Sequence, residues 1–142
     1  MTIISRAESS ATFPDDIPVI KIPYTPEELT KALAGQDAAV CVVGAAGPDV
    51  KVAMVDAAEA AGVRRFIIND FGWGPTFRGL PEFNDVHKKR RAQWDRAKEK
   101  AEVNPAFTWS GITTGNPIDW VRLKQHYPTR AMDTGLYVLT RQ

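Results

Sequence analysis

Apolar and polar residues form two kinds of pattern along this chain, short apolar runs and longer stripes at helical spacing. The runs, bounded by polar turns, predict strands at residues 2–5, 17–22, 37–43, 64–69 and 107–112, with a weaker pattern at 135–139. Helices are expected between them, at residues 25–35, 48–62 and about 82–102. Strands that alternate with helices are typical of an α/β fold with a parallel, doubly wound sheet.

The predicted helices have recognisable ends. Thr25 suits the N-cap, Pro26 the first helical position and Glu28 the third position after the cap. Gly35 and Gly62 are expected to end the first two helices, because glycine tolerates the left-handed backbone of a helix C-cap. The second helix has an apolar stripe, which predicts a buried face, at Val50, Ala53, Met54, Ala57 and Ala61.

The composition is that of one globular domain over residues 1–142. Eighteen Lys and Arg residues nearly balance 17 Asp and Glu residues, so no overall field favours nucleic acid or a membrane surface. Cys41 is the single cysteine and lies in an apolar run, which predicts a buried small side chain and no disulfide. No metal site is expected. No signal peptide or apolar stretch of ~20 residues is found, so we expect a cytoplasmic protein.

A polar turn follows the strand at 64–69, at the kind of edge where doubly wound sheets bind ligands. A second turn, Gly44-Ala45-Ala46-Gly47, follows a strand and opens a helix, like a phosphate-binding loop. It lacks the third glycine of such loops, Pro48 has no N–H to donate, and Asp49 would repel phosphate. We therefore do not expect this loop to be the main phosphate cradle, and a role beside adenine or ribose suits it better.

Six sequence segments carry a family resemblance: TIISR, ALAGQDAAV, DAAEAAGVRRFIINDFG, LPEF, AEVNPAFTWSGI and TTGNPIDW. They cover nearly the whole chain up to about Trp120. On these segments the chain resembles the NmrA-like atypical short-chain dehydrogenases, and within them the fungal isoflavone-reductase-like proteins. The resemblance implies an NADPH-dependent reductase with an extended Rossmann domain and a smaller substrate-binding part. Some relatives bind dinucleotides as redox sensors without catalysis.

The resemblance assigns cofactor contacts to five residues. Arg6 matches the arginine that holds the 2′-phosphate of NADPH, a task that suits a bidentate, permanently charged guanidinium. Gly44 matches the small residue that lets the cofactor approach the backbone. Asn69, Phe71 and Gly72 match the turn beside the nicotinamide. If the family resemblance is set aside, the sequence is equally consistent with Arg6 as an ordinary surface arginine and Phe71 as an ordinary core residue.

Relatives of this family begin with a strand, a glycine-rich loop and a helix upstream of the position that aligns with Met1. We therefore expect an incomplete Rossmann-type parallel sheet that lacks its first strand, glycine-rich loop and first helix. That strand belongs in the middle of the sheet, so two inner strand edges should be left unpaired. The C-terminal substrate-binding part is also expected to be missing. A fragment of this kind should be marginally stable or self-associate through the open edges.

The resemblance also implies a lysine proton donor on the helix at about 82–102. Lys88 matches by residue type, but helical geometry places it nearly opposite the face marked by Trp94 and Ala97. His87 lies beside that face and has a suitable ordinary pKa of about 6.5. Both residues remain candidate acids. A solvated helix face also explains Lys88, and simple packing also explains His87.

Four tryptophans and one asparagine are candidates for substrate contact. Trp73 and Trp120 lie beside predicted ligand turns and are the substrate candidates, whereas Trp94 and Trp109 are expected in the core. Asn116 is a candidate hydrogen-bonding group, although asparagine before proline is also ordinary turn chemistry.

The first hypothesis is an NADPH-dependent oxidoreductase that acts on a small unsaturated or carbonyl-bearing metabolite, inactive if the fragment cannot assemble its site. The alternatives are a non-catalytic NAD(P)-binding regulator and a remnant without function. The expected partners are a small-molecule substrate and further copies of the chain.

Overall fold

The computed structural model describes residues 1–43, 47–70, 84–113 and 136–139. Every strand and helix in these ranges begins and ends within two residues of its prediction. The second strand begins after Pro18, because proline cannot donate to a strand ladder. The elements in chain order are β1 (Thr2–Arg6), β2 (Val19–Ile22), α1 (Pro26–Leu33), β3 (Ala38–Cys41), α2 (Pro48–Ala60), β4 (Arg65–Asp70), α3 (Asn84–Val103), β5 (Thr108–Thr113) and β6 (Leu136–Leu139).

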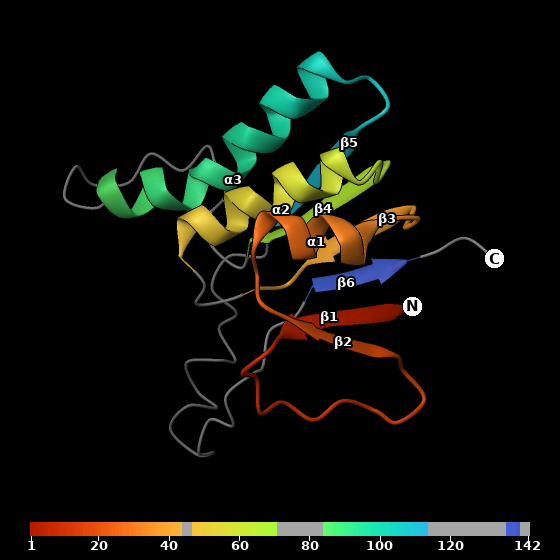
Figure 1. Ribbon diagram of the computed structural model, residues 1–142. Coiled ribbons are helices and arrows are strands. Elements are labelled where there is room, and N and C mark those ends of the chain that lie inside the picture. The colour runs from red at the N-terminus through yellow and green to blue at the C-terminus, as the bar shows by residue number, and fades with distance from the viewer. Residues whose placement is uncertain (44–46, 71–83, 114–135, 140–142) are drawn as a thin grey trace.

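The strands form one sheet in the order β2-β1-β6-β3-β4-β5, and α1, α2 and α3 all lie on one face of it (Figure 1). The chain crosses from β2 to β3 and then steps outward to β4 and β5, always in the same direction across the sheet. Right-handed crossovers in a single direction place every connecting helix on the same face. The arrangement confirms the predicted α/β fold and the alternation that led to it. The described part of the sheet is not doubly wound as predicted, because its three helices cover one face only.

The expectation of two unpaired inner edges is wrong. β6 fills the position between β1 and β3 and pairs with both of them in the antiparallel sense. Val138 lies opposite Thr2 on one side and opposite Ala39 on the other. Backbone donors and acceptors in the middle of a sheet must be paired, and an apolar strand at the far end of the chain supplies the partners. All other strand pairs are parallel, so the sheet is mixed only at its centre.

The predicted ends of α1 and α2 are confirmed. The Thr25 side chain accepts a hydrogen bond from the backbone N–H of Glu28 at 3.4 Å, and Pro26 is the first residue of α1. Gly35 and Gly62 have φ values of +74° and +78°, in the left-handed region expected of glycine after a helix. Of the predicted stripe of α2, Met54 and Ala57 are buried and the other three residues are half-buried.

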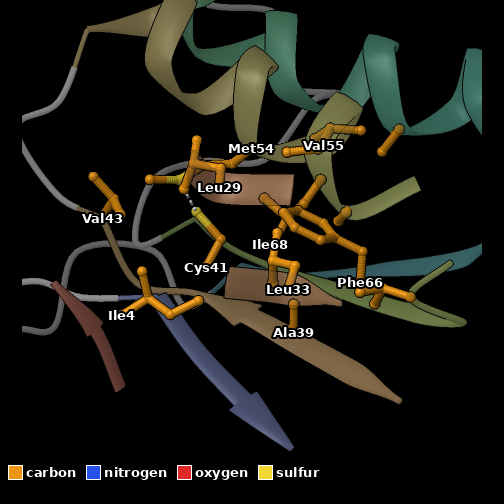
Figure 2. Close-up of a cluster of buried hydrophobic side chains, with 14 of the residues drawn as sticks. Ile4, Leu29, Leu33, Ala39, Cys41, Val43, Met54, Val55, Phe66 and Ile68 are labelled. Carbon is orange, nitrogen blue, oxygen red and sulfur yellow. Dashed lines mark hydrogen bonds between the residues drawn. The ribbon is translucent and has the colours of Figure 1, made fainter. Parts of the chain in front are cut away.

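The core lies between the sheet and the three helices, and Figure 2 shows its central part. The largest fully buried side chains include Phe66 and Phe107, whose ring centroids are 6.3 Å apart. Cys41 is buried as predicted, with its sulfur 3.8 Å from that of Met54. Every second residue of β3 and β4 enters this core, which fixes the face that each strand presents to the helices.

Two tryptophans fix α3 against β5. The rings of Trp94 and Trp109 meet edge to face with centroids 5.3 Å apart, and both pack against the core as predicted. The Trp94 ring lies over Gly111, where an added Cβ would be only 1.8 Å from the ring carbon Cη2. This close approach requires glycine at position 111.

An ion-pair network joins α3 to α2. Arg96 donates to Asp56 at 2.6 Å, and Lys100 donates to Glu59 at 3.0 Å. Asn104 donates to the second carboxylate oxygen of Glu59 at 2.8 Å. The hydrogen bonds from Asn104 and Lys100 lower the pKa of the Glu59 carboxyl, against the smaller opposing effect of burial. The ionised form of Glu59 therefore stabilises the contact between the helices.

Gly111→Ala should lower the free energy of unfolding by about 1–3 kcal/mol, because the new methyl must displace a packed indole ring. Urea denaturation measures this loss. Near-ultraviolet circular dichroism should show that the Trp94–Trp109 contact is disturbed. Gly47→Ala is the control, since no atom lies within 4 Å of the Cβ position there and its φ is negative. Equal stability of the two variants would contradict the packing argument.

Glu59→Gln should lower the free energy of unfolding at pH 7 by about 1 kcal/mol, through loss of its charge-assisted hydrogen bonds. The pKa of Glu59 is lowered in the folded state from an ordinary value of 4.5. Its stabilisation is therefore present above that ordinary value and lost as the pH falls through the lower folded pKa. Urea titrations at several pH values should show variant and wild type converging in acid. Glu102→Gln, at an exposed pair 3.8 Å long, should change little.

Candidate functional site

The carboxyl ends of β1, β3, β4 and β5 lie at one edge of the sheet. β3, β4 and β5 are parallel to one another, and β1 has the same direction because β1 and β3 are both antiparallel to β6. The helices α2 and α3 begin at that edge and run back toward the other one (Figure 1). Ligands of doubly wound sheets bind at such an edge. It is the location predicted from the sequence for the functional site, and we call it the carboxyl edge.

Arg6 is the last residue of β1 and lies at the carboxyl edge. Its backbone is fixed on both sides, since Ser9 donates to the Arg6 carbonyl at 3.0 Å and Ala7 donates to the Ile22 carbonyl at 2.9 Å. Its side chain is 48% exposed and pairs with Glu8 across 3.8 Å. An exposed pair of this length contributes little, so a phosphate can replace the carboxylate as the partner of the guanidinium.

Lys21 is a residue that the sequence analysis did not single out. Its ammonium group donates to the Ser9 carbonyl at 2.8 Å and so fastens the turn that follows Arg6. The parallel register places Lys21 opposite Ser5 on the neighbouring strand. The strand periodicity and this register together could have identified Lys21 once β1 and β2 were paired.

The N-terminus of α2 also lies at the carboxyl edge. Gly47 is its N-cap and has no side chain to satisfy the first N–H groups, while Pro48 is the first helical residue. Asp49 lies in the first turn, where its carboxylate opposes an approaching anion. These positions agree with the sequence argument against a phosphate cradle here. Gly44 lies outside the described residues.

The two candidate acids are in the second turn of α3, at the same edge of the sheet. Lys88 is exposed. Position 87 is helical, but the side chain of His87 lies outside the described part. Arg91, one turn further on, is exposed and pairs with Asp95 at 3.7 Å. The described part of this helix face is therefore a charged, solvated surface.

Gln93 is a second residue that the sequence analysis missed. It is 4% exposed, and its amide nitrogen is 3.3 Å from the sulfur of Cys41 and 3.4 Å from the carbonyl oxygen of Lys51. It thus connects α3 with β3 and α2. In the sequence, Gln93 could have been found as a polar residue in the inward-facing helical stripe that also contains Ala97 and Ala101. Burial raises the pKa of the Cys41 thiol, so this cysteine is not an activated nucleophile.

The side chains of the other predicted site residues lie outside the described part of the chain. Asn69 is in β4, and its backbone lies opposite Ile112 of β5, but its side chain is outside the described part. Five predicted contacts lie wholly outside the described residues: Phe71, Gly72, Trp73, Asn116 and Trp120. Arg6 and Lys88 are thus the predicted site residues whose side chains the structure describes.

The guanidinium of Arg6 is accessible at the carboxyl edge, where it can pair with an anionic group of a ligand. A pyrophosphate needs a row of backbone N–H groups at a helix N-terminus next to the central strand. β6 cannot deliver them, since its first residue, Leu136, lies at the carboxyl edge and its last residue lies at the opposite edge. The described residues therefore do not provide the pyrophosphate cradle.

Neither a metal-binding cluster nor a membrane-spanning helix is found among the described residues. No group of three or more His, Cys, Asp and Glu residues is arranged to hold a metal ion in the described ranges. None of the described helices has the length and apolar character needed to cross a bilayer.

Comparison with known proteins agrees with a nucleotide site. The sequence profile of the NAD(P)H-binding family matches residues 1–132. The chain is 59% identical over 133 residues to the oxidoreductase poxI of Penicillium oxalicum, an alignment that covers 94% of this chain and 42% of poxI. It is 33% identical over 121 residues to the oxidoreductase aprR of Aspergillus flavus, which covers 81% of this chain and 39% of aprR. The chain thus spans less than half the length of these curated relatives. No solved structure matches it.

Proposed function

The chain belongs to the NAD(P)H-binding family, and we propose that it contributes the ribose-phosphate end of an NADPH site to an oxidoreductase of small metabolites. The fold supports this proposal, since it is a partial Rossmann-type arrangement whose strands end together at one edge. The similarity to two fungal proteins that are named oxidoreductases supports the class of reaction.

The observation that carries the proposal is the position of Arg6. A guanidinium at the carboxyl end of β1 offers paired N–H donors to a phosphate, and the fixed turn behind it holds the backbone in place. NADH has no phosphate at this position of the ribose, whereas NADPH has one. We therefore infer a preference for NADPH over NADH, which the family match alone does not distinguish.

The proposed chemistry is reduction of an unsaturated or carbonyl-bearing substrate of the isoflavone-reductase-like kind. A bound nicotinamide supplies the hydride. The chain must then supply a proton, and His87 and Lys88 are the candidate donors because α3 begins at the carboxyl edge. Trp73, Asn116 and Trp120 are proposed to contact the substrate, on the basis of sequence alone.

A non-catalytic NAD(P)-binding regulator is the second candidate function. The direction of β6 favours this function. The antiparallel strand leaves the described residues without a pyrophosphate cradle, whereas Arg6 can still hold the ribose-phosphate end of the nucleotide. The exposed position of Lys88 on a solvated helix face is also what a protein without a proton donor would show. Binding without turnover distinguishes this function from the first.

Arg6→Ala should weaken NADPH binding about tenfold or more and leave NADH binding unchanged, because a charge-assisted hydrogen bond contributes about 1.5–3 kcal/mol. Quenching of tryptophan fluorescence during titration measures both affinities. Arg65→Ala removes an exposed arginine from the amino end of β4, at the opposite edge, and serves as the control. An equal loss of affinity for both nucleotides, or no loss for NADPH, would contradict the role of Arg6.

If the protein turns over a substrate, His87→Ala or Lys88→Ala should lower kcat by roughly a hundredfold while the Kd for NADPH stays constant. The larger loss identifies the proton donor, since only that residue acts on the reacting atoms. Arg91→Ala, on the exposed face of the same helix, is the matched control. Turnover that survives the double substitution at positions 87 and 88 would rule out both assignments.

A further inference from the structure

The connection between β1 and β2 is an irregular loop, residues 7–18, although parallel strands are usually joined by a helix. Because the two strands are parallel, the loop leaves from the carboxyl edge and returns to the opposite edge of the sheet. Its trace lies below β2 in the view of Figure 1. The loop begins directly after Arg6, the residue on which the proposed NADPH site depends.

The first residues of this loop form a compact, hydrogen-bonded turn. Ala7 donates to the last carbonyl of β2 at 2.9 Å, and Ser9 donates to the Arg6 carbonyl at 3.0 Å. The Ser9 side chain accepts a hydrogen bond from the backbone N–H of Ala11 at 3.2 Å. We call residues 7–11 the β1 turn.

Lys21 attaches the β1 turn to the neighbouring strand. Its ammonium group donates to the Ser9 carbonyl at 2.8 Å, and the bond is exposed. Fixing a lysine side chain in one conformation costs an entropy similar in size to what an exposed, charged hydrogen bond returns. The bond therefore adds little to the stability of the whole fold, and its effect is local, on the shape of the β1 turn.

Lys21 and Arg6 leave the sheet from opposite faces. In the parallel register, Lys21 lies opposite Ser5 and Arg6 lies opposite Ile22. Ile22 belongs to the core between the sheet and the helices. Successive strand residues alternate between faces, so Arg6 starts from the face that the helices cover and Lys21 from the other one. Lys21 is thus placed to act on Arg6 through the β1 turn and not on the same ligand.

Glu8 is the residue of the β1 turn that pairs with Arg6. Its carboxylate oxygen is 3.8 Å from the guanidinium nitrogen, and its side chain is 71% exposed. A charge-assisted hydrogen bond between such groups is about 2.7–2.9 Å long, so this pair is not closed. A closed pair would occupy the N–H groups of Arg6 that a phosphate needs.

We propose that Lys21 is a positioning residue of the NADPH site, which through the Ser9 carbonyl holds Glu8 back from Arg6 and so keeps the guanidinium available to the ribose phosphate. This inference rests on the proposed function. Without the bond from Lys21, the β1 turn has more conformations, and in some of them the Glu8 carboxylate closes on Arg6. Lys21 therefore affects the affinity for NADPH and not the affinity for NADH, which has no phosphate at this position.

Lys21→Met keeps the length of the side chain and removes the donor. It should weaken NADPH binding about three- to fivefold, the effect of one exposed ion pair, and leave NADH binding unchanged. Tryptophan fluorescence titrations measure both Kd values, and urea denaturation should give the wild-type midpoint. Lys21→Arg, whose guanidinium can donate to the same carbonyl, should restore the NADPH affinity. Lys31→Met removes an exposed lysine of α1 that pairs with Glu28 at 2.8 Å, and this control should bind both nucleotides like wild type.

Two double substitutions separate positioning from direct contact. Glu8→Gln should raise the NADPH affinity more in the Lys21→Met protein than in wild type, because only there does the carboxylate close on Arg6. In the Arg6→Ala protein, Lys21→Met should cause no further loss of NADPH affinity. Equal gains from Glu8→Gln in the two proteins, or a further loss in the Arg6→Ala protein, would overturn the proposal.

The behaviour of the wild type and of Arg6→Ala distinguishes this inference from the proposed function. Wild-type protein that binds no NADPH, or that binds it no more tightly than Arg6→Ala does, would refute the proposed function and the role of Lys21 with it. NADPH affinity that falls in Arg6→Ala and stays at the wild-type value in Lys21→Met would refute the role of Lys21 alone.

Discussion

The pairing of backbone groups at the centre of the sheet is the constraint on which the rest of the structure depends. β1 and β2 form one parallel pair, β3, β4 and β5 form a second parallel group, and β6 joins the two. Without a strand at this position, β1 and β3 would have unpaired backbone N–H and C=O groups beside the buried residues Ile4 and Ala39. The four residues of β6 thus join the two groups of strands beneath a core to which α1, α2 and α3 contribute.

The direction of the strands explains both what the carboxyl edge offers and what it lacks. Parallel strands deliver their last residues, and the first residues of the following helices, to the same edge, which places Arg6, Gly47 and the start of α3 there. The strand at the centre delivers its last residue to the other edge. The parallel strands thus account for the residues that the carboxyl edge presents, and the antiparallel direction of β6 explains why no described helix N-terminus follows the central strand at that edge.

Most of the fold was predictable from local patterns, and the centre of the sheet was not. The signals at Thr25, Gly35 and Gly62 act within one helical turn, and the structure confirms each of them. The placement of β6 depends on a contact between the two ends of the chain, which no local pattern encodes. Lys21 and Gln93 were missed for a similar reason, since their roles come from the strand register and from the docking of α3. Several predicted contacts, among them Phe71 and Asn116, lie outside the described residues and stay predictions.

The indole of Trp94 fills the space that a side chain at position 111 would otherwise occupy. The two positions therefore share one fixed volume, although they belong to different elements. In homologous proteins a larger residue at 111 should be accompanied by a smaller one at 94, so that substitutions at the two positions are correlated. Such paired changes would report how closely α3 approaches the sheet in each member.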